Sequence, residues 1–252
     1  MVSSFNAAHY VQAPSSELSE TMASPASFKL LYFPILGLAG TSRDILSYAG
    51  AEFESIFPGN WNEDKGNTPM GCLPVLFITS KNGKQVILSE AAVIEQYLAK
   101  LYGLLGDNEY EETMIKSFHN TCFSFQHMFA NLITWNQPEA SPKCLAYFKA
   151  NSLPSFCESL ERHLKDNGNN GHFVGNKLSL ADIRVSNLLE HFWQQPSAPE
   201  LIEILKKYPN LYKMRESVAN HPKLAVWRKS EGWSTIDKNS RSFFENPFAV
   251  MS

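Results

Sequence analysis

Four side chains in the N-terminal part of the chain have chemically useful groups, two of them at the end or start of a predicted element and two in a loop. Tyr32 falls near the end of the apolar run 28–33, where a rigid strand can aim its phenol hydroxyl. Trp61 and Lys65 lie in one loop and offer an indole N–H and a cation. Glu90 stands where a helix is predicted to begin, a place that attracts carboxylates. Each also has a purely structural interpretation. Tyr32 and Trp61 would be buried aromatic side chains of the core, Lys65 a solvated surface charge, and Glu90 a favourable charge at a helix start.

The remaining metal-binding and thiol side chains give weaker signals. The four cysteines form no Cys-x-x-Cys pair and no zinc spacing, so neither a disulfide scaffold nor a zinc site is indicated. His119, Cys122 and His127 share one predicted helix but only loosely one face, which favours core packing over metal binding. We therefore expect no metal and no prosthetic group, and a reducing, cytoplasmic setting.

Composition excludes several classes of protein. A length of 252 residues suits one large domain or two small ones. The 22 basic and 25 acidic residues give a net charge of −3, so we do not expect a nucleic-acid partner. Apolar runs such as 73–78 fall far short of the ~20 residues that span a bilayer, so we expect no membrane partner.

Residues 28–102 have the pattern of a small α/β unit. Gly50 is placed to end its first helix, and Asn82-Gly83 is a strong hairpin signal that makes the last two strands antiparallel. Ser89 is placed to cap the helix that follows them. In chain order the predicted elements are strand 28–33, helix 41–49, strand 52–57, strand 73–78, strand 85–88 and helix 90–102.

The rest of the body has helical periodicity. It runs through 109–133, 143–165, 179–194 and 199–230, with breaks, and Pro residues divide the last stretch. The serine and aspartate of Ser179-Leu-Ala-Asp182 have the spacing of a capping box at the start of an apolar helix. An α/β domain followed by a helical domain is what the pattern predicts.

The two ends of the chain lack this periodicity. Residues 1–27 are rich in Ser and Ala, contain no Lys or Arg, and match neither a secretory signal nor a mitochondrial transit peptide. We expect a flexible N-terminal extension, in which Met22 is a candidate for an internal start site that the sequence alone does not decide. Residues 235–252 are expected to form an aperiodic C-terminal tail whose phenylalanines can pack back onto the body.

These residues, in this order, resemble the soluble glutathione S-transferases over about 28–230. The tyrosine at the strand end is similar to the tyrosine-type members, and the Trp61/Lys65 pair looks most like the sigma class. The resemblance implies a thioredoxin-like glutathione-binding domain at 28–103 and an all-α domain at 108–234. Beside Trp61 and Lys65, the matching segments are LYFP at 31–34, TP at 68–69, GCLPVL at 71–76, LSEA at 88–91, FVGNKLSLAD at 173–182, YPNL at 208–211 and HPKL at 221–224.

The resemblance also implies how the chain binds glutathione, a tripeptide with two carboxylates, one ammonium and one thiol. Tyr32 would donate a hydrogen bond to the sulfur and stabilise the reactive thiolate. Trp61, through its indole N–H, and Lys65, as a cation, would hold the carboxylate of the glycine end.

The other implied contacts involve the segment before the third strand and the start of the helix after the fourth. A cis peptide between Leu73 and Pro74 would turn the Leu73 backbone toward the cysteinyl unit. Glu90 would meet the γ-glutamyl ammonium, and the backbone amides at Glu90 and Ala91 its carboxylate. Cys72 adjoins these residues, as a buried small hydrophobe or, alternatively, as a redox-sensitive thiol.

Some residues depart from the family's pattern. Ala91 replaces a hydroxyl residue, Leu38 stands where sigma-like proteins often have Arg, and Lys116 stands where some relatives have an acid. Each loss removes about 1 kcal/mol of hydrogen bonding. Together the departures argue against tight glutathione binding, while Tyr32, Trp61 and Lys65 remain in place.

Two functions follow as hypotheses, with a third that is weaker. The leading one is a glutathione transferase that joins glutathione, as co-substrate, to an apolar electrophile, with peroxidase or isomerase chemistry as a side activity. The alternative is a non-catalytic glutathione-binding regulator or carrier of the same fold. A thiol oxidoreductase would require Cys72 to react. The family further implies a homodimer.

Overall fold

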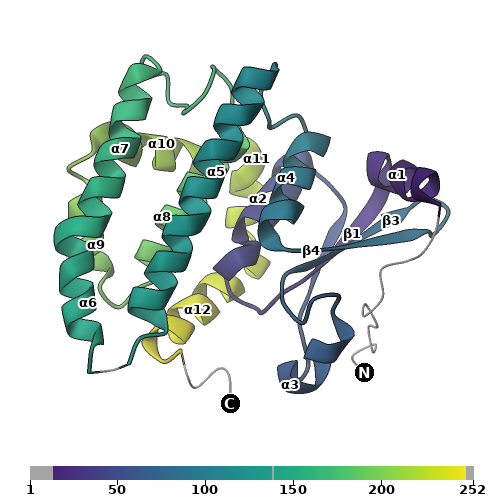
Figure 1. Cartoon of the computed structure of the whole chain (residues 1–252), viewed down its shortest axis with the longest axis horizontal. Coiled ribbons are helices and arrows are strands. Elements are labelled where there is room, and N and C mark those ends of the chain that lie inside the picture. The colour runs from purple at the N-terminus through teal and green to yellow at the C-terminus, as the bar shows by residue number, and fades with distance from the viewer. Residues whose placement is uncertain (1–13, 138, 248–252) are drawn as a thin grey trace. The chain divides into compact units, whose positions relative to one another are not determined.

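The computed structural model describes residues 14–137 and 139–247, and the chain divides into two compact units, Met1–Tyr102 and Gly103–Ser252 (Figure 1). The first unit contains a four-stranded sheet with helices, and the described part of the second contains only helices. The predicted architecture, a thioredoxin-like α/β domain followed by an all-α domain, is therefore confirmed.

The sheet of the first unit has the strand order β2-β1-β3-β4. The central strand β1 (Pro25–Leu31) pairs in parallel with β2 (Phe53–Ile56) and antiparallel with β3 (Val75–Ser80). A hairpin at Asn82-Gly83 joins β3 to the antiparallel strand β4 (Gln85–Ser89), as the sequence predicts. Apolar side chains of three strands form one buried cluster, Leu31, Val75, Phe77 and Ile87.

Short helices connect the strands. The helix α2 (Gly40–Ala49) ends at Gly50 in the left-handed conformation with φ 63°, as predicted, and packs against α4 (Ala91–Leu101). The remaining elements between β1 and β3 are η1 (Gly37–Ala39), α3 (Trp61–Asp64) and η2 (Lys65–Asn67).

The prediction that Ser89 caps α4 is wrong. Ser89 pairs with Val75 as the last residue of β4, which keeps its backbone in the sheet. Glu90 is the N-cap residue instead, with φ 75° and no hydrogen bond from its side chain to the helix. A positive φ is strained for a residue with a Cβ atom, so Glu90 is held there by the elements on either side.

Part of the predicted flexible extension is ordered structure. The helix α1 occupies Ser15–Ala23, packs against β3 and β4, and is followed directly by β1. Lys84 of the hairpin lies 2.6 Å from the Glu17 carboxylate, and Tyr97 donates a hydrogen bond of 2.7 Å to the Met22 carbonyl. Because these contacts use a polar side chain and a backbone carbonyl, no apolar periodicity indicated the helix. The first part of the expected extension, 1–13, lies outside the described residues.

The second unit is organised around α8 (Leu180–Trp193), whose residues are almost all buried. Both α5 (Glu109–Phe129) and α10 (Pro209–Ala219) pack against α8. Ser179 and Asp182 form the predicted capping box at its start. The other helices are α5 (Glu109–Phe129), η3 (Ala130–Thr134), α6 (Ser141–Tyr147), η4 (Phe148–Ser152), α7 (Leu153–Asp166), α9 (Ala198–Leu205), α10 (Pro209–Ala219), α11 (Pro222–Arg228) and α12 (Glu231–Glu245).

The prediction of an aperiodic tail from 235 is wrong for its first part, since α12 runs to Glu245. Its buried residues Ile236, Ser240 and Phe243 are spaced as one helical face, and a serine in the middle of that face hid the apolar stripe. The Phe243 ring lies 5.5 Å from the ring of Trp135, so the helix packs onto its own unit. Phe248 lies outside the described residues.

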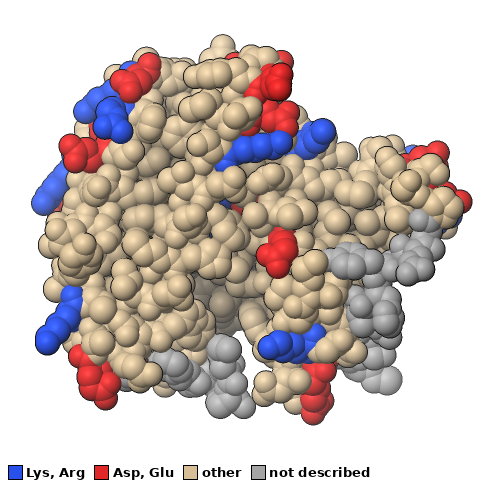
Figure 2. All heavy atoms as spheres, in the orientation of Figure 1, with Lys and Arg blue, Asp and Glu red and all other residues tan. Residues whose placement is uncertain are grey.

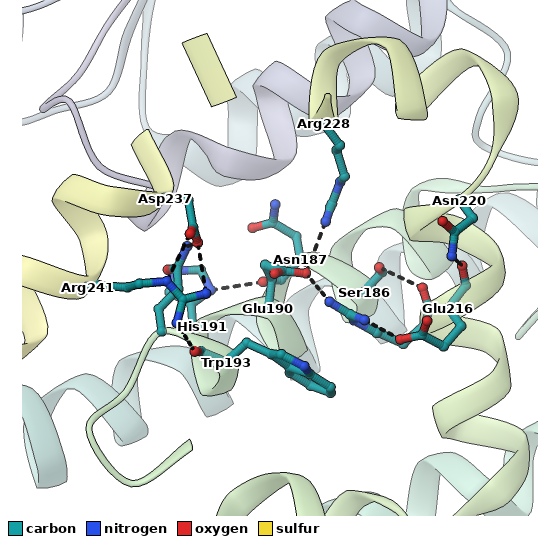
Figure 3. A network of polar contacts seen from close by, with 12 residues as sticks. Ser186, Asn187, Glu190, His191, Trp193, Glu216, Asn220, Arg228, Asp237 and Arg241 are labelled. Carbon is teal, nitrogen blue, oxygen red and sulfur yellow. Dashed lines mark hydrogen bonds and ion pairs between the residues drawn. The ribbon is translucent and has the colours of Figure 1, made fainter. Parts of the chain in front are cut away.

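A network of charged side chains joins α8 to the last three helices (Figure 3). Glu190 of α8 accepts hydrogen bonds from Arg215 of α10 and from Arg228 of α11, the latter at 3.0 Å. Asp237 of α12 accepts from Arg241 at 2.8 Å, and Arg241 donates to the last carbonyl of α8 at 2.7 Å. Removing one partner from a buried pair leaves an uncompensated charge, so the loss of Glu190 or of either arginine would destabilise the packing of these helices.

The loop before α8 contains a pH-dependent contact. His172 Nδ1 lies 3.2 Å from a carboxylate oxygen of Asp182, whose side chain is fully buried. The hydrogen bond to Asp182 raises the pKa of His172 above its ordinary value, although burial opposes this. Protonated His172 therefore stabilises the folded state below pH about 6.5, and this contribution disappears as pH rises through the raised value.

We expect His172→Ala to destabilise the protein by about 1 kcal/mol at about pH 5.5 and by much less at about pH 8.5. Urea unfolding of the wild type and the variant at both pH values measures the difference. Burial and the charges of Lys223 and His172 lower the pKa of His221, so the titration of His221 changes stability in the opposite direction. The quantity to compare is therefore the difference in unfolding free energy between variant and wild type at each pH. A difference that grows with pH contradicts the prediction.

Within the residues that the structure describes, no helix is both long enough and apolar enough to cross a membrane.

Candidate functional site

The ends of four strands bring the predicted site residues of the first unit to one edge of its sheet. Leu31 is in register with both Ile56 and Val75, and Val75 is in register with Ser89. The residues next along the chain at these ends therefore share that edge. They are Tyr32 after β1, the loop toward Trp61 after β2, Pro74 before β3 and Glu90 after β4.

The Tyr32 side chain is positioned by the Phe33–Leu38 return, a tight turn in which the chain folds back on itself. Its backbone N–H still bonds the Ile56 carbonyl at 3.1 Å, which continues the pairing with β2 by one residue. The chain then folds back, so that the Leu38 N–H donates to the phenol oxygen at 3.0 Å. The side chain is buried, with 7% of its surface exposed. The hydroxyl is the acceptor in this hydrogen bond, so the bond does not use its own proton.

The electrostatics keep Tyr32 protonated. Burial raises the pKa of Tyr32 above its ordinary value, while the Leu38 hydrogen bond and the nearby charge of Arg43 oppose that rise. The side chain is thus a phenol at neutral pH and a hydrogen-bond donor. This is the form that stabilises a neighbouring anion.

Gly37 allows the chain to fold back so close to Tyr32. It has φ +41°, and a Cβ atom placed on it would lie 2.4 Å from the phenol oxygen of Tyr32. Only a residue without a side chain allows the backbone to pass so close to the ring.

The contacts of Arg43, a residue of α2, lie around Tyr32. Its guanidinium donates to the Ile35 carbonyl at 2.7 Å and to the Phe33 carbonyl at 3.3 Å. Its central carbon lies 5.9 Å from the centre of the Tyr32 ring. No local motif predicts these bonds, because they depend on how the return folds back over α2.

Trp61 and Lys65 occupy one short helical stretch after β2. The ring of Phe33 contacts both the Tyr32 ring, at 5.6 Å between centres, and the Trp61 ring, at 5.7 Å, edge-on in each case. Trp61 is half-buried and Lys65 is exposed. The Lys65 chain passes Gly71, where a Cβ atom would lie 3.6 Å from its Cε atom. The structure thus links Trp61 to Tyr32 through Phe33, and Lys65 to the segment before β3.

That segment contains the cis peptide between Leu73 and Pro74, as predicted. Beside it, the Cys72 thiol donates a hydrogen bond of 3.5 Å to the Glu90 carboxylate. Burial raises the pKa of Cys72, and the charge of Glu90 and this hydrogen bond raise it further. Cys72 is therefore a poor nucleophile, which argues against the hypothesis of a thiol oxidoreductase. It is half-buried and hydrogen-bonded to a carboxylate, so the prediction of a buried small hydrophobe is wrong.

Glu90 and Ala91 begin α4. The Glu90 side chain is exposed, and Ala91 is buried at the first helical position. The first amides of a helix have no partner within the helix, and they point toward whatever lies at its N-terminus. The edge of the sheet thus combines an amide-rich helix start, a carboxylate, an indole, a cation and a phenol. Such a set suits a flexible ligand with both acidic and basic groups.

The charged side chains on the face shown in Figure 2 form no extended binding surface of one sign. There, the described Lys and Arg side chains are scattered among Asp and Glu and form no continuous basic stripe. Nor do the described residues contain a group of three or more His, Cys, Asp or Glu side chains that could hold a metal ion. His119 and Cys122 are buried and His127 is exposed, so these three do not share one environment.

A family profile and a curated relative that resemble this chain are both described as glutathione S-transferases. The family profile described as "Glutathione S-transferase, C-terminal domain" matches residues 124–231. The chain is 29% identical over 203 residues to the glutathione S-transferase class-mu 28 kDa isozyme of Schistosoma japonicum, covering 79% of this chain and 95% of that protein.

Solved structures with a similar fold include a glutathione S-transferase and a prostaglandin synthase. The sigma class GST of Fasciola hepatica has a TM-score of 0.71 and 25% identity, covering 81% of this chain and 95% of the other. Prostaglandin synthase D of Nilaparvata lugens has a TM-score of 0.70 and 29% identity, covering 81% and 98%.

Proposed function

Because the chain belongs to the glutathione S-transferase family, we propose that it conjugates reduced glutathione to apolar electrophilic small molecules through a thiolate that Tyr32 stabilises. The observation that carries this proposal is the state of Tyr32. It is a buried phenol whose oxygen already accepts the Leu38 N–H and whose proton can be donated to a ligand.

The energetics favour such a donor. A free thiol has a pKa of about 8.5, so only a few per cent is ionised at neutral pH. A hydrogen bond that the anion accepts and the thiol does not lowers that pKa selectively. A decrease of about 2 units corresponds to about 2.7 kcal/mol and makes most of the bound glutathione anionic. The thiolate then attacks the electrophilic carbon, the new C–S bond forms, and the leaving group departs with its electron pair.

The other residues at the sheet edge are proposed to hold the peptide. Lys65 and the Trp61 indole bind the carboxylate of the glycine end, and the Leu73 backbone beside the cis Pro74 pairs with the cysteinyl unit. Glu90 binds the γ-glutamyl ammonium, and the free amides of α4 at Ala91 bind the adjacent carboxylate. Cys72 lines the same edge without reacting. Glutathione is thus a co-substrate, and no prosthetic group takes part in the proposed reaction.

An assay with a chromogenic aryl halide tests the function directly. We expect glutathione-dependent conjugation well above the uncatalysed rate. Lys65→Met should raise the KM for glutathione several-fold with little change in kcat, because a ground-state contact to a carboxylate is lost. Lys81→Met, in the exposed hairpin, is the matched control and should behave as the wild type. Retention on a glutathione column without any conjugation would instead identify a binding protein and reject the enzyme.

We also propose that the protein is a homodimer in the cytoplasm, as is typical of the family. Light scattering should give twice the 28.4 kDa mass of the chain. A mass of one chain would reject the dimer without affecting the proposed chemistry.

A further inference from the structure

A buried arginine lies behind the tyrosine on which the proposed function depends. Arg43 on α2 is fully buried, which is rare for a charged side chain. Its hydrogen bonds within the described part of the chain go to neutral oxygens, namely the Phe33 and Ile35 carbonyls and the Ser55 hydroxyl at 3.4 Å. Burial lowers its pKa to about 10, against the opposing influence of Tyr32 and Asp44, so Arg43 is still a cation at neutral pH.

Both carbonyls belong to the return that carries Leu38 back to Tyr32. The guanidinium fork holds the return at two points, the Phe33 and Ile35 carbonyls. The second of these lies three residues before Leu38, whose N–H reaches the phenol oxygen. The direction in which the Tyr32 hydroxyl points its O–H is therefore set by the Phe33–Leu38 return, and Arg43 holds that segment in place by two hydrogen bonds.

The charge of Arg43 acts on the same group. Its central carbon lies 5.9 Å from the centre of the Tyr32 ring, and water is largely excluded from both side chains. A cation at this distance favours negative charge at the phenol oxygen and at a sulfur that shares its proton. The hydrogen bonds of Arg43 to the return and its positive charge thus both favour donation of the Tyr32 proton to an anion.

We propose that Arg43 is a positioning residue for conjugation, which holds the Phe33–Leu38 return and, with its charge, strengthens the hydrogen bond from Tyr32 to the glutathione thiolate. This inference rests on the proposed function, since Arg43 acts only through Tyr32. A merely structural arginine would affect the amount and stability of folded protein, but not the ionisation of the bound thiol.

The pH dependence of kcat/KM separates these roles. In Arg43→Gln, which has neither the charge nor the fork, we expect the apparent pKa of the bound thiol to rise by about one unit. The value of kcat/KM for the electrophile at saturating glutathione should then fall about tenfold at about pH 5.5. Arg43→Lys keeps the charge and should recover part of this loss. The KM for glutathione should change by less than about twofold, because Arg43 makes no proposed contact with the peptide.

Combining variants tests whether Arg43 acts through Tyr32. In a Tyr32→Phe background, Arg43→Gln should cause no further shift in the thiol pKa. Arg228→Gln, which removes a buried arginine from the second unit, is the control for general destabilisation and should leave the thiol pKa unchanged. Rates are normalised to the folded fraction, and Arg43→Lys supplies the answer if Arg43→Gln does not fold.

The outcomes distinguish this inference from the proposed function. If Tyr32→Phe shifts the thiol pKa and neither Arg43 variant does, the inference about Arg43 is overturned while the function stands. The same holds if the Arg43 effect persists at full size without the Tyr32 hydroxyl. If Tyr32→Phe itself causes no shift, the proposed function fails first.

Discussion

Replacing Tyr32 with Phe is expected to lower kcat/KM for conjugation by roughly tenfold or more at neutral pH, with little loss of stability. The change removes one oxygen and keeps the ring that contacts Phe33. What is lost is the proton that the phenol donates to the thiolate. The Leu38 N–H also loses its acceptor, which contributes about 1 kcal/mol of destabilisation.

The loss should depend on pH. Without the donor, the bound thiol returns toward the pKa of a free thiol, about 8.5. The activity of the variant should therefore approach that of the wild type as pH rises past this value. Ultraviolet absorbance of the bound thiolate, titrated against pH, measures the same shift without turnover.

Tyr97→Phe is the matched control. It removes a hydroxyl from the same unit, and with it the 2.7 Å hydrogen bond to the Met22 carbonyl, but it lies outside the proposed site. We expect similar destabilisation and unchanged activity. Equal activity of Tyr32→Phe and the wild type across the pH range would reject a tyrosine-stabilised thiolate.

Local signals in the sequence predicted most of the first unit. The Asn82-Gly83 hairpin and the left-handed Gly50 each depend on one or two residues, and the structure contains both. The capping box at Ser179 is of the same kind. Such features can be predicted because neighbours in the chain determine them.

Features set by distant contacts were missed. The helix α1 is held by Tyr97 and Lys84, far away in sequence, and α12 presents a buried face interrupted by Ser240. At the site, the residue types could be predicted, but the support of Tyr32 by Leu38 and Arg43 could not. That support uses backbone groups, which every residue has and which no pattern of side chains indicates.

Gly37→Ala is expected to lower kcat/KM by roughly tenfold or more, although residue 37 contacts no ligand in the proposed mechanism. The added Cβ atom would lie 2.4 Å from the Tyr32 oxygen and 2.6 Å from its Cε1 atom, closer than real Cβ contacts. Either the ring or the return must move. The ring is buried and the return is held by Arg43, so the hydrogen bond from Leu38 to the phenol is the contact most easily broken.

Gly50→Ala separates this clash from backbone strain. Gly50 also has a positive φ, +63°, but a Cβ atom there would meet nothing within 4 Å. Both variants should lose about 1 kcal/mol of stability from the left-handed conformation, measured by urea unfolding. Only Gly37→Ala should also lose activity and raise the pKa of the bound thiol. If the two variants have the same activity, the close approach of Gly37 to Tyr32 does not determine where the phenol points.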